Sequence, residues 1–224
     1  MKAISNFKRA ITEQQKNERR RKVLASARRL FEQEDFQSIT IAQIARKSGI
    51  AKGSVFLYFK TKEELFFCLT LEELEKWNDE FDRRLKEIVH GKTAKSSDLL
   101  DLIDSTLMNN SVLIRLLAMV NVILEQNIGY KQANQFKRAL LERALHTGHL
   151  LDKSVSFFRT GDGVKFYLYL YILIIGLHQA SNPAPIIKRV LQHPDFHVFN
   201  INFRSYFLEM LKYLLDGMKR GRTL

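Results

Sequence analysis

Proline, glycine and cysteine are all scarce in this sequence of 224 residues. The three prolines, Pro183, Pro185 and Pro194, lie late in the chain, and only ten glycines occur. Because proline breaks helices, this distribution allows long uninterrupted helices over most of the sequence. Hydrophobic residues make up 46% of the chain, which is enough to bury a core. We therefore expect an all-α protein.

Cys68 is the single cysteine, which excludes an intrachain disulfide and suits a reducing compartment. The N-terminus lacks the apolar core of a signal peptide. The longest apolar run, residues 166–177, is too short to span a bilayer as a helix. We expect a cytoplasmic protein that does not use a membrane.

Acidic residues are outnumbered by basic ones, 24 against 36, and the formal net charge is +12. Residues 1–30 carry most of this excess. A basic balance favours polyanionic partners such as nucleic acid or an acidic membrane surface. Residues 1–16 are polar and basic, and we expect a mobile arm or a loosely formed helix there. This segment has two functional interpretations: contact with a DNA groove or flanking phosphates, or a solvated tail.

Signals for catalysis and metal binding are missing. The chain has no phosphate-binding glycine loop, no nucleophile elbow and no catalytic spacing of His, Cys and carboxylates. His146 and His149 lack an obvious third ligand, and Pro194 disrupts the helical spacing of His193 and His197. We expect no enzyme, no metal site and no cofactor.

Apolar residues recur at steps of three and four along most of the chain, which predicts a succession of helices. The segment YLYLYILII also alternates like a strand, but its length without proline favours a helix. The predicted helices cover about residues 18–34, 41–47, 52–59, 61–89, 98–108, 111–128, 130–149, 162–180 and 200–219.

Residues 40–65 carry strong local signals. Thr40 with Gln43 and Thr61 with Glu64 are capping boxes that start helices. Gly49 supplies the left-handed backbone of a tight turn between two short helices. This pattern predicts a helix-turn-helix motif over residues 41–60. Two packed short helices without a DNA-binding role are the alternative.

The stretch TIAQIARKSGIAKGSVFLYFKTKEEL resembles the DNA-binding signature of the tetracycline-repressor (TetR) family, T-x-x-x-I-A-x-x-A-G-[VI]-[SA]-x-G-[TS]-[LV]-Y-x-[HY]-F-x-[SN]-K-E-x-L. The likeness extends upstream through ASARRLFEQEDFQSIT and covers the first quarter of the chain. Phe56 and Ala51 depart from it, because the family usually has tyrosine and often serine there. After the basic arm (1–16), the resemblance implies an N-terminal three-helix helix-turn-helix DNA-binding domain (17–66) and a C-terminal helical ligand-binding and dimerisation domain (67–224).

By position, the resemblance implies that the second motif helix enters the major groove of a double-stranded operator. Lys52 would donate to guanine or to a phosphate and Leu57 would contact a thymine methyl group, while Tyr58 and Lys62 would clamp phosphates. Val55 and Phe59 should face inward. The residues expected at DNA are Thr40, Gln43, Lys52, Gly53, Ser54, Phe56, Leu57, Tyr58 and Lys62.

The resemblance also implies a ligand-released repressor that reads a palindrome as a homodimer, through helices at about 162–180 and 200–219. A small hydrophobic or amphipathic effector would bind in the body of the C-terminal domain and shift the spacing of the two DNA-reading heads. The candidate effector residues are Trp77, Asn121, Glu125, Gln126, Tyr130, Phe157, Tyr167, Tyr171 and His178.

Two other functions stay open at this point. One is a DNA-binding or architectural protein that has no small-molecule effector or is regulated by a protein partner. The other is a membrane-surface protein that uses its basic arm.

Overall fold

The computed structural model describes residues 13–221, so residues 1–12 and 222–224 lie outside the described part. Most of the predicted basic arm is therefore not described, and residues 13–16 belong to the first helix rather than to an arm. Across the described range the chain forms helices and turns without a strand, apart from an isolated bridge between Ala94 and Val155. This confirms the all-α prediction.

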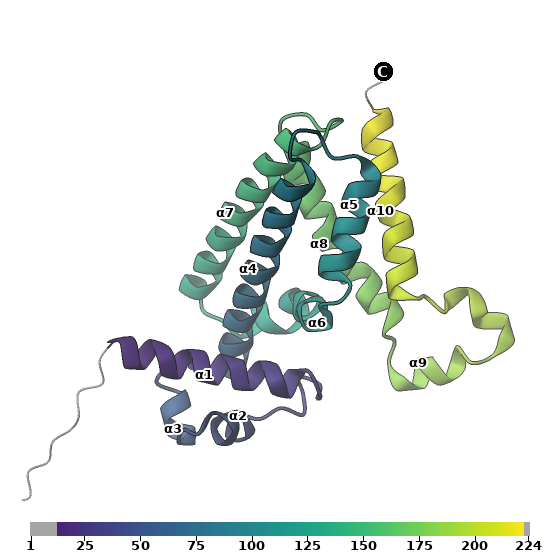
Figure 1. Ribbon diagram of the computed structural model, residues 1–224. Helices are drawn as coiled ribbons and strands as arrows, with labels where there is room; N and C mark the ends of the chain where they lie inside the picture. Colours follow the sequence, from purple (N-terminus) through teal and green to yellow (C-terminus); the bar gives the residue numbers. More distant parts are fainter. Residues whose placement is uncertain (1–12, 222–224) are drawn as a thin grey trace, which may run out of the picture. The chain divides into compact units, whose positions relative to one another are not determined.

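The chain divides into two units, residues 1–69 and 70–224. The division falls inside α4 (Lys62–Ile88), three residues after the predicted boundary. The first unit consists of α1 (Glu13–Phe31), α2 (Ile41–Ser48), α3 (Lys52–Val55) and the beginning of α4 (Figure 1).

Aromatic side chains form the centre of the first unit. The ring of Phe66 meets the ring of Phe31 edge-on at 5.4 Å and that of Phe36 at 5.0 Å, measured between centroids. All three side chains are buried, and so are Val23 and Leu24 of α1. This core holds α1 against the start of α4, and α2 packs against both α1 and α3.

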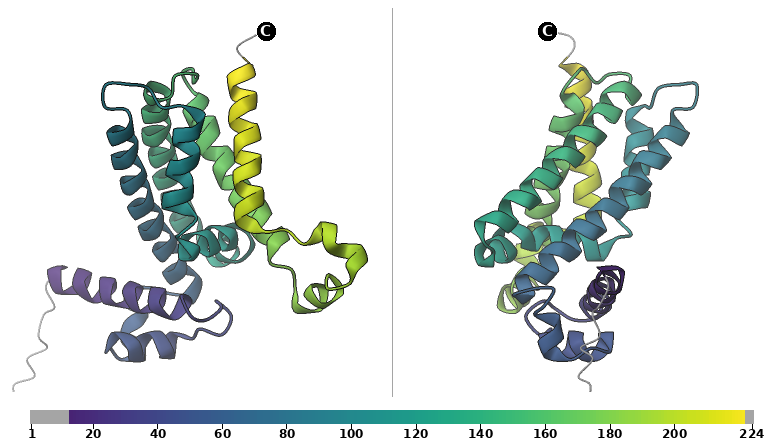
Figure 2. Two further views of the ribbon diagram at one scale, coloured as in Figure 1. Left: turned by 45° about the vertical axis from the view of Figure 1, so that its right-hand side comes forward. Right: turned by 90° about the vertical axis from the view of Figure 1, so that its left-hand side faces the viewer.

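The second unit is a bundle of longer helices (Figures 1 and 2). Its helix α8 contacts α6, α7 and α10 and is therefore central to the bundle. The elements after α4 are α5 (Ser96–Leu107), α6 (Ser111–Met119), the π-helix η1 (Val120–Leu124), the 3-10 turn η2 (Glu125–Asn127), α7 (Tyr130–Ser154), α8 (Asp162–Ser181), α9 (Pro185–Val190), the 3-10 helix η3 (Pro194–Phe199) and α10 (Phe203–Arg220).

Two predicted helices end early as α-helices, whereas α1 begins before its predicted start and α7 runs past its predicted end. The helix predicted over 111–128 is α-helical only to Met119 and then widens into η1 and tightens into η2. The helix predicted over 52–59 ends as an α-helix at Val55 and continues as turns. The elements α9 and η3 were not predicted, because prolines signal breaks as readily as helix starts.

Helices α7 and α8 cross with their backbones in contact. A Cβ atom built on Gly163 would lie 2.1 Å from the carbonyl oxygen of Gly148, which is far inside van der Waals contact. The carboxylate of Asp152 accepts hydrogen bonds of 2.7 Å from the backbone N–H groups of both Gly161 and Gly163. Gly148 and Gly163 permit the close approach of the two helices, and Asp152 caps the beginning of α8.

The apolar helix α8 is only partly covered. Phe166, Leu170 and Ile174 are buried in the bundle, whereas Leu168 and Ile172 are each 54% exposed. By length and composition alone α8 could cross a membrane, contrary to the expectation from its apolar run, but a core helix of a soluble protein passes the same test.

Candidate nucleic-acid interface and effector cavity

Helix α2 begins with the predicted capping box. The N–H of Gln43 donates to the Thr40 hydroxyl oxygen at 3.2 Å, and the Thr40 N–H donates to the Gln43 side-chain oxygen at 2.7 Å. Gly49 follows with φ of 70°, the left-handed conformation that the turn requires. Ile44 and Ala45 are buried beneath the turn. The predicted helix-turn-helix geometry is confirmed at this level.

Helix α3 and the turns that follow it, residues 52–59, have an inward side and an outward side, as predicted. Val55 and Phe59 are fully buried, and the guanidinium of Arg20 lies 5.2 Å from the centre of the Phe59 ring. On the outward side, Leu57 is 74% exposed and Phe56 is 46% exposed. Exposed apolar side chains on a short helix are available for contact with another molecule.

The remaining residues predicted at DNA lie around this outward face. Lys52 and Gly53 are exposed, while Ser54 and Tyr58 are half-buried. The hydroxyl of Ser48 donates to the Ala45 carbonyl at 3.0 Å, so it belongs to α2 and does not cap α3. No side-chain cap on α3 occurs in the described part of the chain.

Lys62 has a role inside the first unit that sequence analysis missed. Its ammonium group donates to the carbonyl oxygens of Phe36 at 2.8 Å and Ile39 at 3.0 Å. Burial lowers the pKa of Lys62, and the nearby Glu63 carboxylate opposes that shift. Because a lysine has three N–H donors, one remains for another acceptor. A phosphate contact by Lys62 therefore stays a prediction.

The second capping box differs in detail from the pattern. The N–H of Glu64 donates to the Thr61 hydroxyl at 3.0 Å, as expected. The Glu64 carboxylate accepts its 2.7 Å bond from the N–H of Lys60 rather than from that of Thr61. Exposed basic residues that the prediction left out, Arg46 and Lys47, occupy the last turn of α2. Their position within the helix-turn-helix motif was the signal by which the sequence could have marked them as candidates for DNA contact.

The second unit contains a cavity of about 350 Å³ between α4, α6, α7 and α8. Its wall is mainly aliphatic and aromatic. The lining residues are Leu74, Trp77, Leu117, Val120, Phe136, Lys137, Leu140, Leu141, Ala144, Val164, Tyr167, Leu168, Tyr171 and Ile174.

Trp77, Tyr167 and Tyr171 are the predicted effector residues that line this cavity. Asn121 and Glu125 do not line the cavity, but each contacts a lining residue: Asn121 accepts a hydrogen bond from Tyr171, and Glu125 pairs with Lys137. The other four predictions are not brought to the cavity: Gln126 and Tyr130 are exposed, Phe157 packs in the core against Phe158, and His178 lies beside Phe203 of α10. Sequence analysis missed the aliphatic lining, which has the same composition as an ordinary core.

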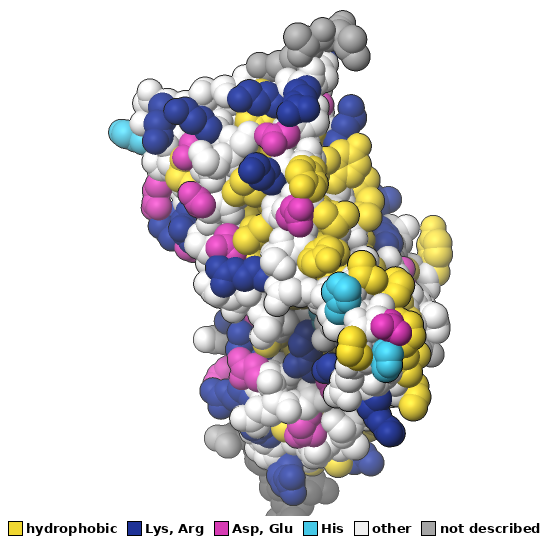
Figure 3. Space-filling view, turned by 90° about the vertical axis from the view of Figure 1, so that its right-hand side faces the viewer, with side chains coloured by type: hydrophobic (Ala, Val, Ile, Leu, Met, Phe, Trp, Pro, Cys, Tyr) yellow, Lys and Arg dark blue, Asp and Glu magenta, His cyan; other side chains and the backbone are white. Residues whose placement is uncertain are grey.

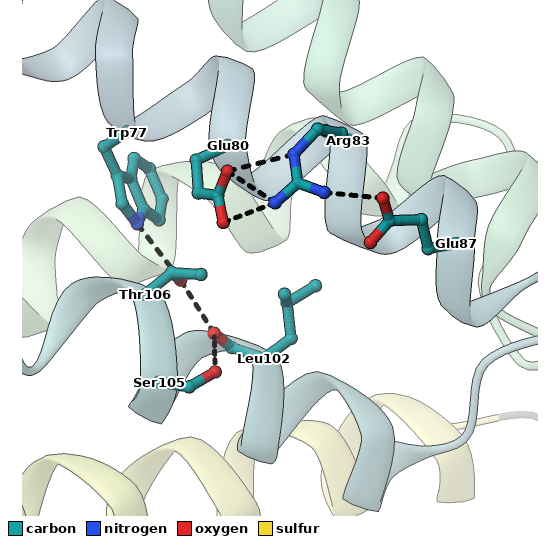
Figure 4. A network of polar contacts seen from close by, with 7 residues as sticks. All are labelled: Trp77, Glu80, Arg83, Glu87, Leu102, Ser105 and Thr106. Carbon is teal, nitrogen blue, oxygen red and sulfur yellow. Dashed lines mark hydrogen bonds and ion pairs between the residues drawn. The ribbon is translucent and has the colours of Figure 1, made fainter.

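Hydrogen bonds hold the aromatic wall of the cavity. The indole N–H of Trp77 donates to the hydroxyl of Thr106 at 3.3 Å, and Thr106 donates to the Leu102 carbonyl at 2.7 Å (Figure 4). The Tyr167 hydroxyl donates to Asn78 at 3.0 Å, and burial raises the pKa of Tyr167 to about 12. Each hydroxyl oxygen that donates can still accept a hydrogen bond.

A charged pair lies at the edge of the same cavity. The ammonium of Lys137 is 2.7 Å from a carboxylate oxygen of Glu125. The Tyr171 hydroxyl, which donates to Asn121 at 3.2 Å, has its pKa raised by burial and by the Glu125 carboxylate. The cavity thus combines an apolar body with one cationic side chain and two phenol oxygens.

Comparison with known families identifies both units. Residues 23–68 match the model described as bacterial regulatory proteins, tetR family. Residues 71–222, more than half of the chain, match the model described as the tetracyclin repressor-like C-terminal domain.

Individual relatives give the same picture. The chain is 29% identical over 73 residues to the HTH-type transcriptional regulator HbdR of Aromatoleum, and 34% identical over 58 residues to the HTH-type transcriptional repressor Rv1474c of Mycobacterium tuberculosis. These alignments cover 33% and 26% of this chain, and 32% and 31% of the two relatives, so the chain matches about a third of each relative's length. A putative TetR-family regulator from Mesorhizobium loti has the same fold, with a TM-score of 0.56, 16% identity and coverage of 90% of this chain and 95% of that one.

Proposed function

Because this chain belongs to the tetracycline-repressor family of bacterial regulatory proteins, we propose that it is a DNA-binding transcriptional repressor that a small molecule releases from its operator. The outward face of α3 carries the proposal. Val55 and Phe59 anchor that helix from beneath, while Lys52 and Leu57 stand free of the core. Such a protein would act in the cytoplasm, where operator DNA is.

Each exposed group on α3 has a chemical counterpart in a major groove. Lys52 can donate to guanine O6 and N7 or to a phosphate, and Leu57 can contact a thymine methyl group. Gly53 lets the backbone approach DNA, and Ser54 can bond a base edge or a phosphate. Tyr58, Thr40 and Gln43 would position the helix on the backbone without reading sequence.

Regulators of this family act as dimers, and we propose that α8 and α10 form the interface. Leu168 and Ile172 expose an apolar stripe on α8 that continues to Gly176. On α10, Tyr206, Met210 and Tyr213 are exposed at helical spacing. A dimer would bury both stripes and would place two recognition helices on a palindrome, with half-sites about 34–36 Å apart.

The 350 Å³ cavity is the proposed effector site. Its aliphatic wall suits a hydrophobic body. Lys137 could exchange its bond to Glu125 for one to an acidic group of the effector, which makes an amphipathic anion the ligand that the cavity chemistry favours. Thermal melting against hydrophobic acids, neutral apolar compounds and lipophilic cations tests this. No stabilisation by any class would favour a DNA-binding protein without an effector or one controlled by a protein partner.

Selection of bound DNA from a random pool tests the function itself. We expect enrichment of a palindromic consensus by the wild-type protein and its loss in Lys52→Ala, with the melting temperature unchanged. If no sequence is enriched, the proposed function is wrong.

A further inference from the structure

A short segment projects from the second unit between α8 and α10 (Figures 1 and 2). It consists of α9 (Pro185–Val190) and η3 (Pro194–Phe199), and we refer to these two elements as the α9–η3 projection. Within the described chain, neither element contributes a buried side chain. The projection therefore adds nothing to the core of its own unit.

The projection nevertheless has defined local structure. Pro185 and Pro194 each start a helix at a position where the missing N–H is not needed. The side chain of Asn200 donates to the Leu191 carbonyl at 3.2 Å and ties the end of η3 to the end of α9. The ring nitrogen Nδ1 of His193 accepts from the N–H of Asp195 at 3.3 Å. These bonds shape the segment without help from the bundle.

Large apolar side chains cover the projection and face solvent. Val198 is 63% exposed, Ile186 62% and Phe199 59%. Ordering a residue costs backbone conformational entropy, and burial of apolar surface is the main term that offsets this cost. An ordered segment with exposed apolar side chains is therefore typical of a surface that another molecule covers. The full exposed set is Ile186, Ile187, Val190, Phe196, Val198 and Phe199.

We infer that a second copy of this chain covers the projection, which clasps the partner beside the proposed α8–α10 interface. The inference rests on the dimer of the proposed function and extends it. The projection joins the end of α8 to the start of α10, the two helices with unpartnered apolar stripes. Figure 3 shows hydrophobic side chains gathered over α10 and continuing onto the projection.

Symmetry makes the continuity of this surface important. In a two-fold dimer both copies use the same patch and every contact occurs twice, so a residue at the edge of the patch on one copy meets another part of the patch on the other copy. Each projection then buries its apolar side chains on the partner around α8 and α10. Interfaces between permanent partners are larger and more apolar than transient ones, and the apolar surface of the projection would enlarge the dimer interface in this way.

Sedimentation equilibrium of the full chain tests the inference. The variant Ile186→Ser/Val198→Ser/Phe199→Ser removes exposed side chains, so the monomer should fold normally. Because each copy would lose three buried apolar side chains from the interface, we expect the dimer dissociation constant to rise about 100-fold or more. A matched control, Val122→Ser/Leu145→Ser, changes exposed apolar side chains of η1 and α7 and should leave the constant within about threefold.

Separate outcomes distinguish this inference from the proposed dimer. If Ile172→Glu on α8 dissociates the dimer but the triple variant does not, the clasp is wrong and the α8–α10 interface stands. If neither variant has an effect, the interface itself fails as well. Loss of binding to anionic vesicles by the triple variant, with an unchanged dimer, would assign the projection to a membrane and overturn the inference.

A cross-linking measurement guards against misfolding of the triple variant. A photoreactive benzoylphenylalanine at position 199 replaces one exposed aromatic side chain by another. In a mixture of isotope-labelled and unlabelled copies, we expect cross-links that join one copy to the other. Cross-links confined to a single copy would overturn the clasp.

Discussion

The ammonium group of Lys62 lies 4.0 Å from the centroid of the Phe36 ring and donates a 2.8 Å hydrogen bond to the Phe36 carbonyl oxygen. A second bond joins it to the carbonyl of Ile39. Lys62 therefore fixes the loop between α1 and α2 to the first turn of α4, within the unit that carries the recognition helix.

The first prediction is that Lys62 stabilises the fold, whereas Lys52 contributes to DNA binding. Lys62→Met removes the donor for two carbonyl groups, so we expect the free energy of unfolding to fall by about 1–3 kcal/mol. Lys52→Ala, on the exposed face, should leave stability within about 0.5 kcal/mol and weaken DNA binding. Urea denaturation followed by circular dichroism measures both. A stable Lys62→Met protein that binds DNA poorly would instead make Lys62 a phosphate contact.

Phe56 provides a gain-of-affinity test. It is 46% exposed at a position where the family usually has tyrosine, so Phe56→Tyr adds a hydroxyl that can donate to a phosphate. Hydrogen bonds to charged groups are worth about 1.5–3 kcal/mol, which predicts about tenfold or greater tightening on the selected operator. Phe59→Tyr is the matched control, because Phe59 is fully buried and the same change there should lower stability. Unchanged operator affinity in Phe56→Tyr would place that side chain away from the DNA backbone.

The crossing of α7 and α8 predicts an intolerant glycine. Gly163→Ala forces a methyl group against the Gly148 carbonyl, so we expect a loss of stability of about 1–3 kcal/mol or more. Gly53→Ala in α3, where a Cβ atom meets nothing within 4 Å, should be neutral or stabilise the free protein by up to about 1 kcal/mol. Thermal melting compares the two, and equal melting temperatures would show that the crossing can relax.

Filling the cavity should uncouple effector binding from DNA binding. Ala144 lines the cavity, and Ala144→Trp places a large side chain inside it. We expect the variant to keep operator affinity within about threefold and to lose any thermal stabilisation by the effectors of the wild-type protein. Retained stabilisation would place the effector site elsewhere.

His178 predicts a pH dependence of stability. Burial, and next the charge of Arg115, lower the pKa of His178 below its ordinary value of 6.5. The unfolded chain then binds a proton more readily than the folded chain, so stability falls as the pH drops from about 6.5 toward the folded pKa. We expect the melting temperature to fall less between pH 7.5 and 5.5 in His178→Gln than in the wild type. His149→Gln, at an exposed position of α7, is the control, and an equal fall in His178→Gln and wild type would contradict the prediction.

Local signals explain why much of the first unit could be predicted. The capping box of Thr40 and Gln43 and the turn at Gly49 involve residues within a few positions of each other. The inward positions of Val55 and Phe59 follow from helical spacing. In contrast, the partners of Lys62 are 26 and 23 residues away, and no pattern in the sequence reveals a bond between a lysine and distant carbonyls.

The effector cavity was harder to predict for a different reason. Its boundary depends on how closely α4, α6, α7 and α8 pack, and residues such as Phe136 and Leu74 look the same whether they face a cavity or a filled core. The aromatic residues with polar tips, Tyr167 and Tyr171, were recognisable because their hydroxyl groups need partners. Polar residues without that constraint, such as Gln126, do not line this cavity.

Because of the π-helix η1, the number of residues in the stretch 120–124 determines the direction of the side chains that follow it. The N–H of Glu125 donates to the carbonyl of Val120, a wider loop than an α-helix allows, so the turn accommodates an inserted residue. Deleting one residue there would restore the α-helical register and rotate later side chains by about 100°. Glu125 would then turn away from Lys137. Insertions and deletions, which surface loops usually tolerate, should therefore be selected against in residues 120–124, and related sequences that retain this charged pair should align across them without a gap.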